Sequence, residues 1–265
     1  MKPNGIITFT TDFGDTDGYV GIMKGVILSI NPDARLVDIS NQVPGHDIGA
    51  GAFLLNYSYR YFPVGTVHLV IVDPGVGSTR RAIAVETDNY YFIAPDNGIL
   101  HYLFQTEKDV KVIDIQNRNY ALEKISRTFH GRDIFAPAAA HLSRGLPIDE
   151  LGPHITDVEH GKITSPEIDA DKITGEIAYI DRFGNLICNI PGFVIGNRSC
   201  SIQILDFQIG KLSDSYSAGD PGMPVAIIGS SGYLEIAVNK HSAKKFLNAA
   251  LGDRITVHFN GHGEQ

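Results

Sequence analysis

The chain has 265 residues, 43% of them hydrophobic, and a formal net charge of −8. This composition is typical of a globular protein with a sizeable core, and the negative charge argues against nucleic acids and anionic membranes as partners. No window holds the roughly 18 consecutive apolar residues of a membrane span, and the first residues lack a signal-peptide pattern, so we expect a cytoplasmic protein that acts on small molecules.

The first segment of the chain predicts a strand, an acidic loop and a helix. The β-rich run Ile6–Thr10 is followed by TDFGDTDG and then by the helical pattern YVGIMKGVILSI. Asp12, Asp15 and Asp17 in the loop can be read as a metal site, as carboxylates that bind hydroxyl groups, or as helix caps. Asp17, directly ahead of Gly18, is the residue best placed to face a ligand.

The second and third segments repeat the alternation of strand and loop. The run ARLVDIS predicts a strand, and residues 50–62 predict a helix. The apolar run Leu69–Val72 then ends at Asp73, and a glycine-rich loop leads to Arg80 and a further apolar run, AIAV. Because ligands bind at the carboxyl ends of strands in open α/β sheets, we expect Asp73 and Arg80 at a functional site. The alternative is an ordinary turn with a surface ion pair.

Further along, residues 82–94 predict a hairpin around Asp88 and Asn89. Asp96 and Asn97 follow its second strand, where they can be caps or ligand contacts. After a strand in VKVIDI, His130 lies directly before an Ala-rich helical run. A loop histidine in this position favours a role in proton transfer, since imidazole titrates near neutral pH.

The pattern changes after residue 145. Residues 146–171 are rich in Pro, Asp and His without a sustained period, which predicts a linker between an α/β domain (1–165) and a second domain (172–265). The second domain reads as six β-rich runs with one helical interruption, SAKKFLNAAL, which is typical of a small sandwich or barrel. Cys188 and Cys200 lack a CxxC spacing, so we expect buried thiols without a disulfide or zinc site. His262, in the tail, is too isolated to be expected as a metal ligand.

Two loops of the second domain carry polar and aromatic groups suited to a nucleoside. Asp181, Phe183 and Asn185 offer a carboxylate, an aromatic face and an amide within DRFGN. The run GSSGYLEIAVNK adds Ser231 and Asn239. The alternative for both loops is hairpin chemistry, because Gly, Asn, Asp and Ser dominate turns.

Taken together, TTDFGDTDGYVGIMKG, VDPGVGSTRRAIAV, APDNGIL, TFHGRDIFAP, DRFGNLICNI and SSGYLEIAVNK resemble the S-adenosylmethionine hydroxide adenosyltransferases, over nearly the whole chain and in order. This family also holds the S-adenosylmethionine-dependent fluorinases and chlorinases. The resemblance implies an α/β N-terminal domain with a central sheet flanked by helices, followed by a smaller, all-β, barrel-like C-terminal domain. It also implies a homotrimer with its sites between neighbouring subunits.

The resemblance further implies which residues act. The implied catalytic residues are Asp73, Arg80 and His130, and the implied substrate contacts are Asp17, Asp181, Phe183, Asn185, Ser231 and Asn239. The implied reaction joins water to the 5′ carbon of S-adenosyl-L-methionine and releases adenosine and L-methionine, with no metal and no cofactor. Whether Asp73 or His130 takes the proton is left open. The alternatives are a metal-dependent hydrolase, whose activity chelation would abolish, and a nucleoside-binding protein that leaves its ligand intact.

Overall fold

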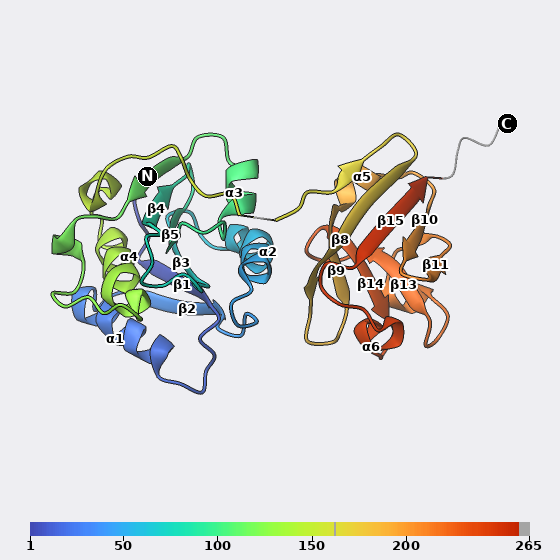
Figure 1. Cartoon of the computed structure of the whole chain (residues 1–265), viewed down its shortest axis with the longest axis horizontal. Coiled ribbons are helices and arrows are strands. Elements are labelled where there is room, and N and C mark those ends of the chain that lie inside the picture. The colour runs from blue at the N-terminus through green and yellow to red at the C-terminus, as the bar shows by residue number, and fades with distance from the viewer. Residues whose placement is uncertain (162, 260–265) are drawn as a thin grey trace. The chain divides into compact units, whose positions relative to one another are not determined.

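The computed structural model describes residues 1–161 and 163–259, and His262 lies outside them. The chain divides into two compact units, Met1–Ile163 and the part from Thr164 onward (Figure 1). The first unit combines helices with one sheet, and the second consists almost entirely of strands. The predicted fold class is therefore confirmed for both units.

The first unit is built on a six-stranded sheet in the order β2-β1-β3-β5-β4-β6. Its strands are β1 (Ile6–Thr11), β2 (Arg35–Ser40), β3 (Val67–Ile71), β4 (Ala82–Glu86), β5 (Tyr91–Pro95) and β6 (Lys111–Asp114). Strands β2, β1, β3 and β5 run parallel, and β4 is antiparallel to both of its neighbours. Every residue of β3 is buried, because it lies in the middle of a sheet covered on both faces, and this explains its continuous apolar run.

Two pairs of helices cover the two faces of this sheet. The helices are α1 (Tyr19–Ile30), α2 (Ile48–Ser58), α3 (His101–Thr106) and α4 (Ala136–Ser143). Figure 1 shows α1 with α4 on one face and α2 with α3 on the other. Helix α1 buries Val20, Met23 and Ile27, which share one face of the helix. Helix α2 is capped by Asp47, whose carboxylate accepts from the backbone N of Ala50 at 2.9 Å.

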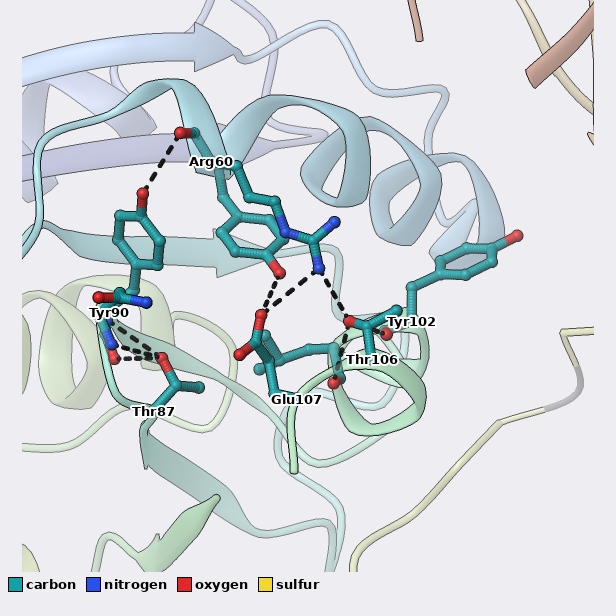
Figure 2. A network of polar contacts seen from close by, with 9 residues as sticks. Arg60, Thr87, Tyr90, Tyr102, Thr106 and Glu107 are labelled. Carbon is teal, nitrogen blue, oxygen red and sulfur yellow. Dashed lines mark hydrogen bonds and ion pairs between the residues drawn. The ribbon is translucent and has the colours of Figure 1, made fainter. Parts of the chain in front are cut away.

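A polar network joins the end of α2 to the end of α3 (Figure 2). The chain leaves α2 through a short 3-10 helix that begins at Tyr59, whose hydroxyl donates to Glu107 Oε1 at 2.8 Å. Arg60 donates to Thr106 Oγ1 at 3.1 Å, and Tyr90 donates to the backbone carbonyl of Arg60 at 3.3 Å. The predicted helix over 50–62 is therefore an α-helix followed by this 3-10 turn, which the network fixes against α3.

Residues 146–161, placed in a linker on their composition, pack on the first unit. A 3-10 helix spans Ile148–Leu151, and the carbonyl of Leu151 accepts from the backbone N of Gln116 at 3.0 Å. The backbone N of Ile155 donates to the carbonyl of Val112 at 3.0 Å. Backbone hydrogen bonds hold this polar segment in place, and hydrophobic periodicity carries no signal for them.

The second unit is a nearly closed, barrel-like sheet of nine strands in the order β11-β10-β15-β8-β9-β14-β13-β12, with β7 paired to β8. The strands are β7 (Glu167–Ile168), β8 (Lys172–Ile180), β9 (Leu186–Pro191), β10 (Cys200–Ile204), β11 (Phe207–Ile209), β12 (Leu212–Ser213), β13 (Pro224–Ile228), β14 (Tyr233–Val238) and β15 (Arg254–Phe259). Two short helices, α5 (Gly192–Ile195) and α6 (Ala243–Leu247), complete it. The helix α6 is shorter than its pattern predicts, because Asn248 adopts the left-handed conformation that ends it.

Both cysteines are free and buried, as predicted. Burial raises the pKa of the Cys188 and Cys200 thiols, so neither thiol is activated as a nucleophile. Within residues 1–161 and 163–259, no helix is long and apolar enough to cross a membrane.

Candidate active site

Asp73 and Arg80 form a buried ion pair at the carboxyl end of β3. Arg80 Nε donates to Asp73 Oδ1 at 3.0 Å, and Arg80 Nη2 donates to Asp73 Oδ2. The side chains are only 5% (Asp73) and 9% (Arg80) exposed. The contact is bidentate, which makes it stronger than a carboxylate–guanidinium pair joined by a single hydrogen bond. It leaves each carboxylate oxygen with a further lone pair for another donor.

His130 joins this pair from a distant part of the sequence. It precedes a π-helical turn, Gly131–Phe135, that leads into α4, and its Nδ1 lies 3.0 Å from Arg80 Nη2. A guanidinium only donates, so Nδ1 accepts, and the proton of the neutral ring lies on Nε2. Burial, followed by the charge of Arg80, lowers the pKa of His130. The structure therefore brings the three predicted catalytic side chains together, with a neutral imidazole beside an ion pair.

The loop that carries Arg80 packs tightly against the turn that carries His130. Gly77 has a φ of +78°, and a Cβ built on it would lie 2.2 Å from the carbonyl oxygen of Arg127. Only glycine fits a backbone contact of this kind. The guanidinium of Arg80 also lies over the ring of Phe135, 5.1 Å from its centroid. The two loops are thus held in one arrangement by backbone and side-chain contacts.

The acidic loop before α1 lies beside the same turn. The ring of Tyr19 is 5.1 Å from the ring of Phe129, the residue that precedes His130. The first residue of α1 has no side-chain cap, so the capping interpretation is wrong for this helix. Asp17 is exposed, and its carboxylate makes no side-chain hydrogen bond with another residue within 1–161 and 163–259.

The other two aspartates of that loop have structural partners. Asp12 accepts from the backbone N of His46 at 2.9 Å, and Asp15 accepts from Gln42 Nε2 at 2.5 Å. Across the residues that the structure describes, no three His, Cys, Asp or Glu side chains are grouped to hold a metal ion. The aspartates at 12 and 15 therefore serve the fold of the loop.

Asp96 and Asn97, open to two interpretations from sequence, also make structural contacts. Asp96 pairs with Arg81 at 2.7 Å, and its other oxygen accepts from the backbone N of Glu159 at 2.8 Å. Asn97 Nδ2 donates to the carbonyl of Val72 at 2.9 Å. Asn97 thereby supports the strand end that presents Asp73.

In the second unit, the DRFGN loop is organised around Asp181. Its Oδ1 accepts from the backbone N of Phe183 at 2.9 Å and of Asn185 at 2.8 Å, and its Oδ2 accepts from Asn185 Nδ2 at 2.9 Å. The ring of Phe183 is left 77% exposed. The hydrogen bonds of an ordinary turn therefore account for the Asp181 carboxylate. They do not account for the exposure of the Phe183 side chain.

The second predicted loop of this unit contains a buried hydroxyl without a partner. Ser231 Oγ is shielded from solvent and has no hydrogen-bond partner in the described part of the chain. Asn239 follows β14 directly and is partly exposed. An unsatisfied buried hydroxyl is costly, and a bound ligand is one way to satisfy it.

Sequence reasoning missed a buried carboxylate beside this loop. Glu235 lies on β14 and accepts from the hydroxyl of Tyr216 at 2.7 Å, and burial raises its pKa. A Cβ on Gly229 would lie 2.3 Å from Glu235 Oε2, so the carboxylate packs against the start of the GSSG turn. The available signal was a single charged residue in an otherwise apolar strand.

Two family models match the chain, and together they cover most of it. The SAM hydroxide adenosyltransferase N-terminal domain matches residues 7–152, and the C-terminal domain of the same family matches residues 175–256. The chain belongs to the SAM hydroxide adenosyltransferase family. The first match contains Asp17, Asp73, Arg80 and His130, and the second contains the predicted loops of the second unit.

Curated relatives of this adenosyltransferase-family chain match it over nearly its whole length. A protein of Salinispora tropica named (R)-S-adenosyl-L-methionine hydrolase is 34% identical over 260 residues, which is 97% of this chain and 99% of the relative. A protein of the same name from Methanocaldococcus jannaschii is 34% identical over 266 residues, or 95% of each chain. A fluorinase of an Actinoplanes species is 28% identical over 295 residues, or 97% of this chain and 99% of the fluorinase.

A solved structure has the same fold. The crystal structure of an uncharacterised conserved protein from Thermotoga maritima superposes with a TM-score of 0.89 at 36% sequence identity, covering 95% of this chain and 99% of the other. The predicted resemblance is confirmed by these comparisons, and both the hydrolase and the fluorinase branch are represented among the relatives.

Proposed function

We propose that the protein hydrolyses S-adenosyl-L-methionine, with water attacking C5′ to give adenosine and L-methionine. The observation that carries this function is the buried cluster of Asp73, Arg80 and His130 at the end of the central strand. The hydrolase names of relatives at 34% identity over nearly the full chain support the same reaction.

The reaction needs a positioned water more than a powerful acid. The C5′–S bond breaks, its electron pair goes to sulfur as the neutral thioether of methionine, and water oxygen forms the new bond to C5′. Because the sulfonium is already a good leaving group, the site must hold water in line at about 3 to 3.5 Å from carbon. The substrate supplies its own positive charge, so the proposed reaction uses no metal and no cofactor.

The geometry favours Asp73 as the acceptor of the water proton. The guanidinium of Arg80 carries only donors and has no lone pair to accept a proton, so it cannot be the base. The hydrogen bond from Arg80 to His130 Nδ1 puts the imidazole proton on Nε2, where the ring donates instead of accepting. Asp73 keeps a lone pair on each oxygen, and in this proposal His130 orients the water that Asp73 deprotonates.

The remaining predicted residues would bind the substrate. Asp17, with its carboxylate unpaired, would accept from ribose hydroxyls. Residues of the second unit would bind the adenine and the methionine end of the substrate. These residues are Asp181, Phe183, Asn185, Ser231 and Asn239. The exposed ring of Phe183 and the unpartnered hydroxyl of Ser231 support these roles.

We also propose that the enzyme is a homotrimer in the cytoplasm. Tyr19, Ile22 and Leu28 leave apolar surface exposed on α1, which supports association of some kind. Two unpaired, buried cysteines suit a reducing compartment. Sedimentation of the purified protein tests the trimer, and a monomer at micromolar concentration would refute it.

Isotope labelling tests the proposed reaction. In water enriched in ¹⁸O, the label should appear on the 5′ hydroxyl of adenosine, and excess chloride should leave the product unchanged because chloride cannot donate a hydrogen bond to Asp73. Unlabelled adenosine or 5′-chloro-5′-deoxyadenosine as the main product would contradict the proposal. Recovery of bound, intact S-adenosyl-L-methionine would instead indicate a binding protein without turnover.

A further inference from the structure

The turn Ser126–Phe129, which directly precedes His130, is fastened at both ends to one residue, Asp133. The backbone N of Ser126 donates to Asp133 Oδ2 at 2.7 Å, and the backbone N of Asp133 donates to the carbonyl of Phe129 at 3.2 Å. Within the turn, the backbone N of Phe129 donates to Ser126 Oγ at 3.0 Å. His130 therefore follows directly on a loop closed by hydrogen bonds to and from Asp133.

Asp133 is itself a fully buried carboxylate with 0% of its surface exposed. Arg132 Nε donates to its Oδ1 at 2.6 Å, and Arg132 Nη2 donates to its Oδ2 at 3.2 Å. Burial alone would raise the pKa of Asp133, but the hydrogen bonds from Arg132 and Ser126 outweigh it and lower the pKa. An ionised carboxylate is stable in this position only because its oxygens are so fully hydrogen-bonded.

The same turn contacts both parts of the candidate site. The carbonyl of Arg127, within the turn, touches Gly77 of the loop that carries Arg80. The His130 ring lies within hydrogen-bond distance of Arg80, because its Nδ1 is 3.0 Å from Arg80 Nη2. A displaced turn would therefore separate His130 Nδ1 from Arg80, and a misplacement of about 1 Å is enough to slow an enzyme about a hundredfold.

We propose that Asp133 is a positioning residue for hydrolysis, acting through the Ser126–Phe129 turn to hold His130 Nδ1 in hydrogen-bond contact with Arg80. The inference rests on the proposed function and adds to it a residue that touches neither substrate nor water. Its charge has a second consequence. Burial and Arg80 lower the pKa of His130, whereas Asp73 and Asp133 raise it, so removal of the Asp133 charge should lower that pKa further.

The test compares Asp133→Asn with a matched control, Asp114→Asn. Asp114 is also a buried carboxylate of the first unit, and it accepts a hydrogen bond from Gln116 Nε2 at 2.7 Å, next to the edge strand β6 and outside the turn that precedes His130. For Asp133→Asn we expect kcat to fall by about tenfold or more with KM within about threefold of wild type. We also expect the acid limb of the pH profile, and the His130 ring resonance followed by NMR, to titrate at lower pH. Asp114→Asn should leave the His130 titration unchanged.

A second variant covers the case in which Asp133→Asn does not fold. Ser126→Ala keeps the backbone hydrogen bond to Asp133 but removes the acceptor for Phe129, so kcat should fall by a few fold with KM unchanged. The proposal is overturned if folded Asp133→Asn keeps wild-type kcat and His130 titration, or if Ser126→Ala lowers thermal stability alone. The NMR spectrum of the His130 ring needs no substrate, so loss of its hydrogen bond with Arg80 in Asp133→Asn can be detected even if wild-type protein fails to cleave S-adenosyl-L-methionine.

Discussion

Two consecutive arginines, Arg80 and Arg81, show how differently the same residue type is used at one end of the sheet. Arg80 is 9% exposed and binds Asp73 and the imidazole of His130. Arg81 is 27% exposed and binds Asp96 and Asp157, each at 2.7 Å. Consecutive side chains of an extended chain point to opposite sides, so the two guanidiniums meet different partners.

The partners decide what each arginine does. Asp157 belongs to the segment 146–161 and its side chain is largely exposed, so Arg81 attaches that segment to the sheet through a partly solvated pair. Arg80 instead joins two loops that meet only in the folded protein, and its pair is shielded from water. Low exposure strengthens the electrostatic effect of Arg80 on a reacting group, whereas solvent screens that of Arg81.

The largest expected contrast is therefore between Arg80→Ala and Arg81→Ala. Loss of a preorganised charge at a reacting centre costs about 10² to 10³ in kcat, which we expect for Arg80→Ala. Arg81→Ala should keep kcat within about threefold and lower the melting temperature instead. Steady-state release of adenosine, followed by chromatography, measures both. Equal losses of activity in the two folded variants would contradict a catalytic role for Arg80 and a structural role for Arg81.

Within the Arg80 cluster, activity and binding should separate. Asp73→Ala and His130→Ala should abolish turnover with substrate affinity within about tenfold of wild type, whereas Asp17→Ala should weaken binding by about 1.5 to 3 kcal/mol. His130→Gln keeps a donor but supplies no base, so it should retain more activity than His130→Ala. Calorimetric titration with substrate, beside single-turnover rates, provides the data. Similar binding losses in all of these variants would refute the assignment.

The pH profile should also distinguish the two arginines. His130 must be neutral to accept from Arg80, and its pKa lies below the ordinary value of 6.5. As pH falls through that lowered pKa, kcat/KM should drop by about tenfold for each pH unit. The hydrogen bond from Arg81 lowers the pKa of Asp157, so the Arg81 pair should survive over the same range. A flat kcat/KM between pH 7 and pH 4 would contradict this role of His130.

Acid unfolding must be separated from this acid limb, and its expected source is His68. Burial lowers the pKa of His68 to about 3, while its ring bonds Thr8 at 2.8 Å. Below pH 6.5 the unfolded chain binds a proton at this residue that the folded protein does not, so stability falls as pH drops from 6.5 toward 3. The loss is about 1.4 kcal/mol per pH unit, or about 2 kcal/mol between pH 6.5 and 5.

The double variant Thr8→Val/His68→Phe checks this smallest effect. It removes the titrating ring and its hydrogen-bond partner together, and phenylalanine suits an aromatic cluster in which His68 already stacks on Phe92 at 5.1 Å. Denaturant unfolding at pH 7.5 and 5 should show a smaller pH-dependent loss in the variant than in wild type. An unchanged loss would mean that other groups cause the acid instability.

Much of the fold could be predicted from local patterns. The helical pattern YVGIMKGVILSI coincides with the observed bounds of α1, Tyr19–Ile30. A helix that buries one face repeats apolar residues every three to four positions, and this repeat is visible in a short stretch of sequence. The buried strand β3 and the hairpin β4–β5 follow for the same reason. The family, and with it the grouping of Asp73, Arg80 and His130, could be recognised from motifs.

What local patterns could not decide are the roles set by contacts between distant residues. The sequence by itself determined the elements, the family and a set of candidate polar residues, because periodicity and motifs are properties of short stretches. Only the tertiary structure showed that Asp17 is unpaired while Asp96 and Asn97 are structural, that segment 146–161 packs on the first unit, and that Asp133 closes the turn before His130. Most of these outcomes depend on burial and on partners dozens of residues away, as with the 63 positions that separate Asp96 from Glu159, and such contacts leave no trace in local sequence.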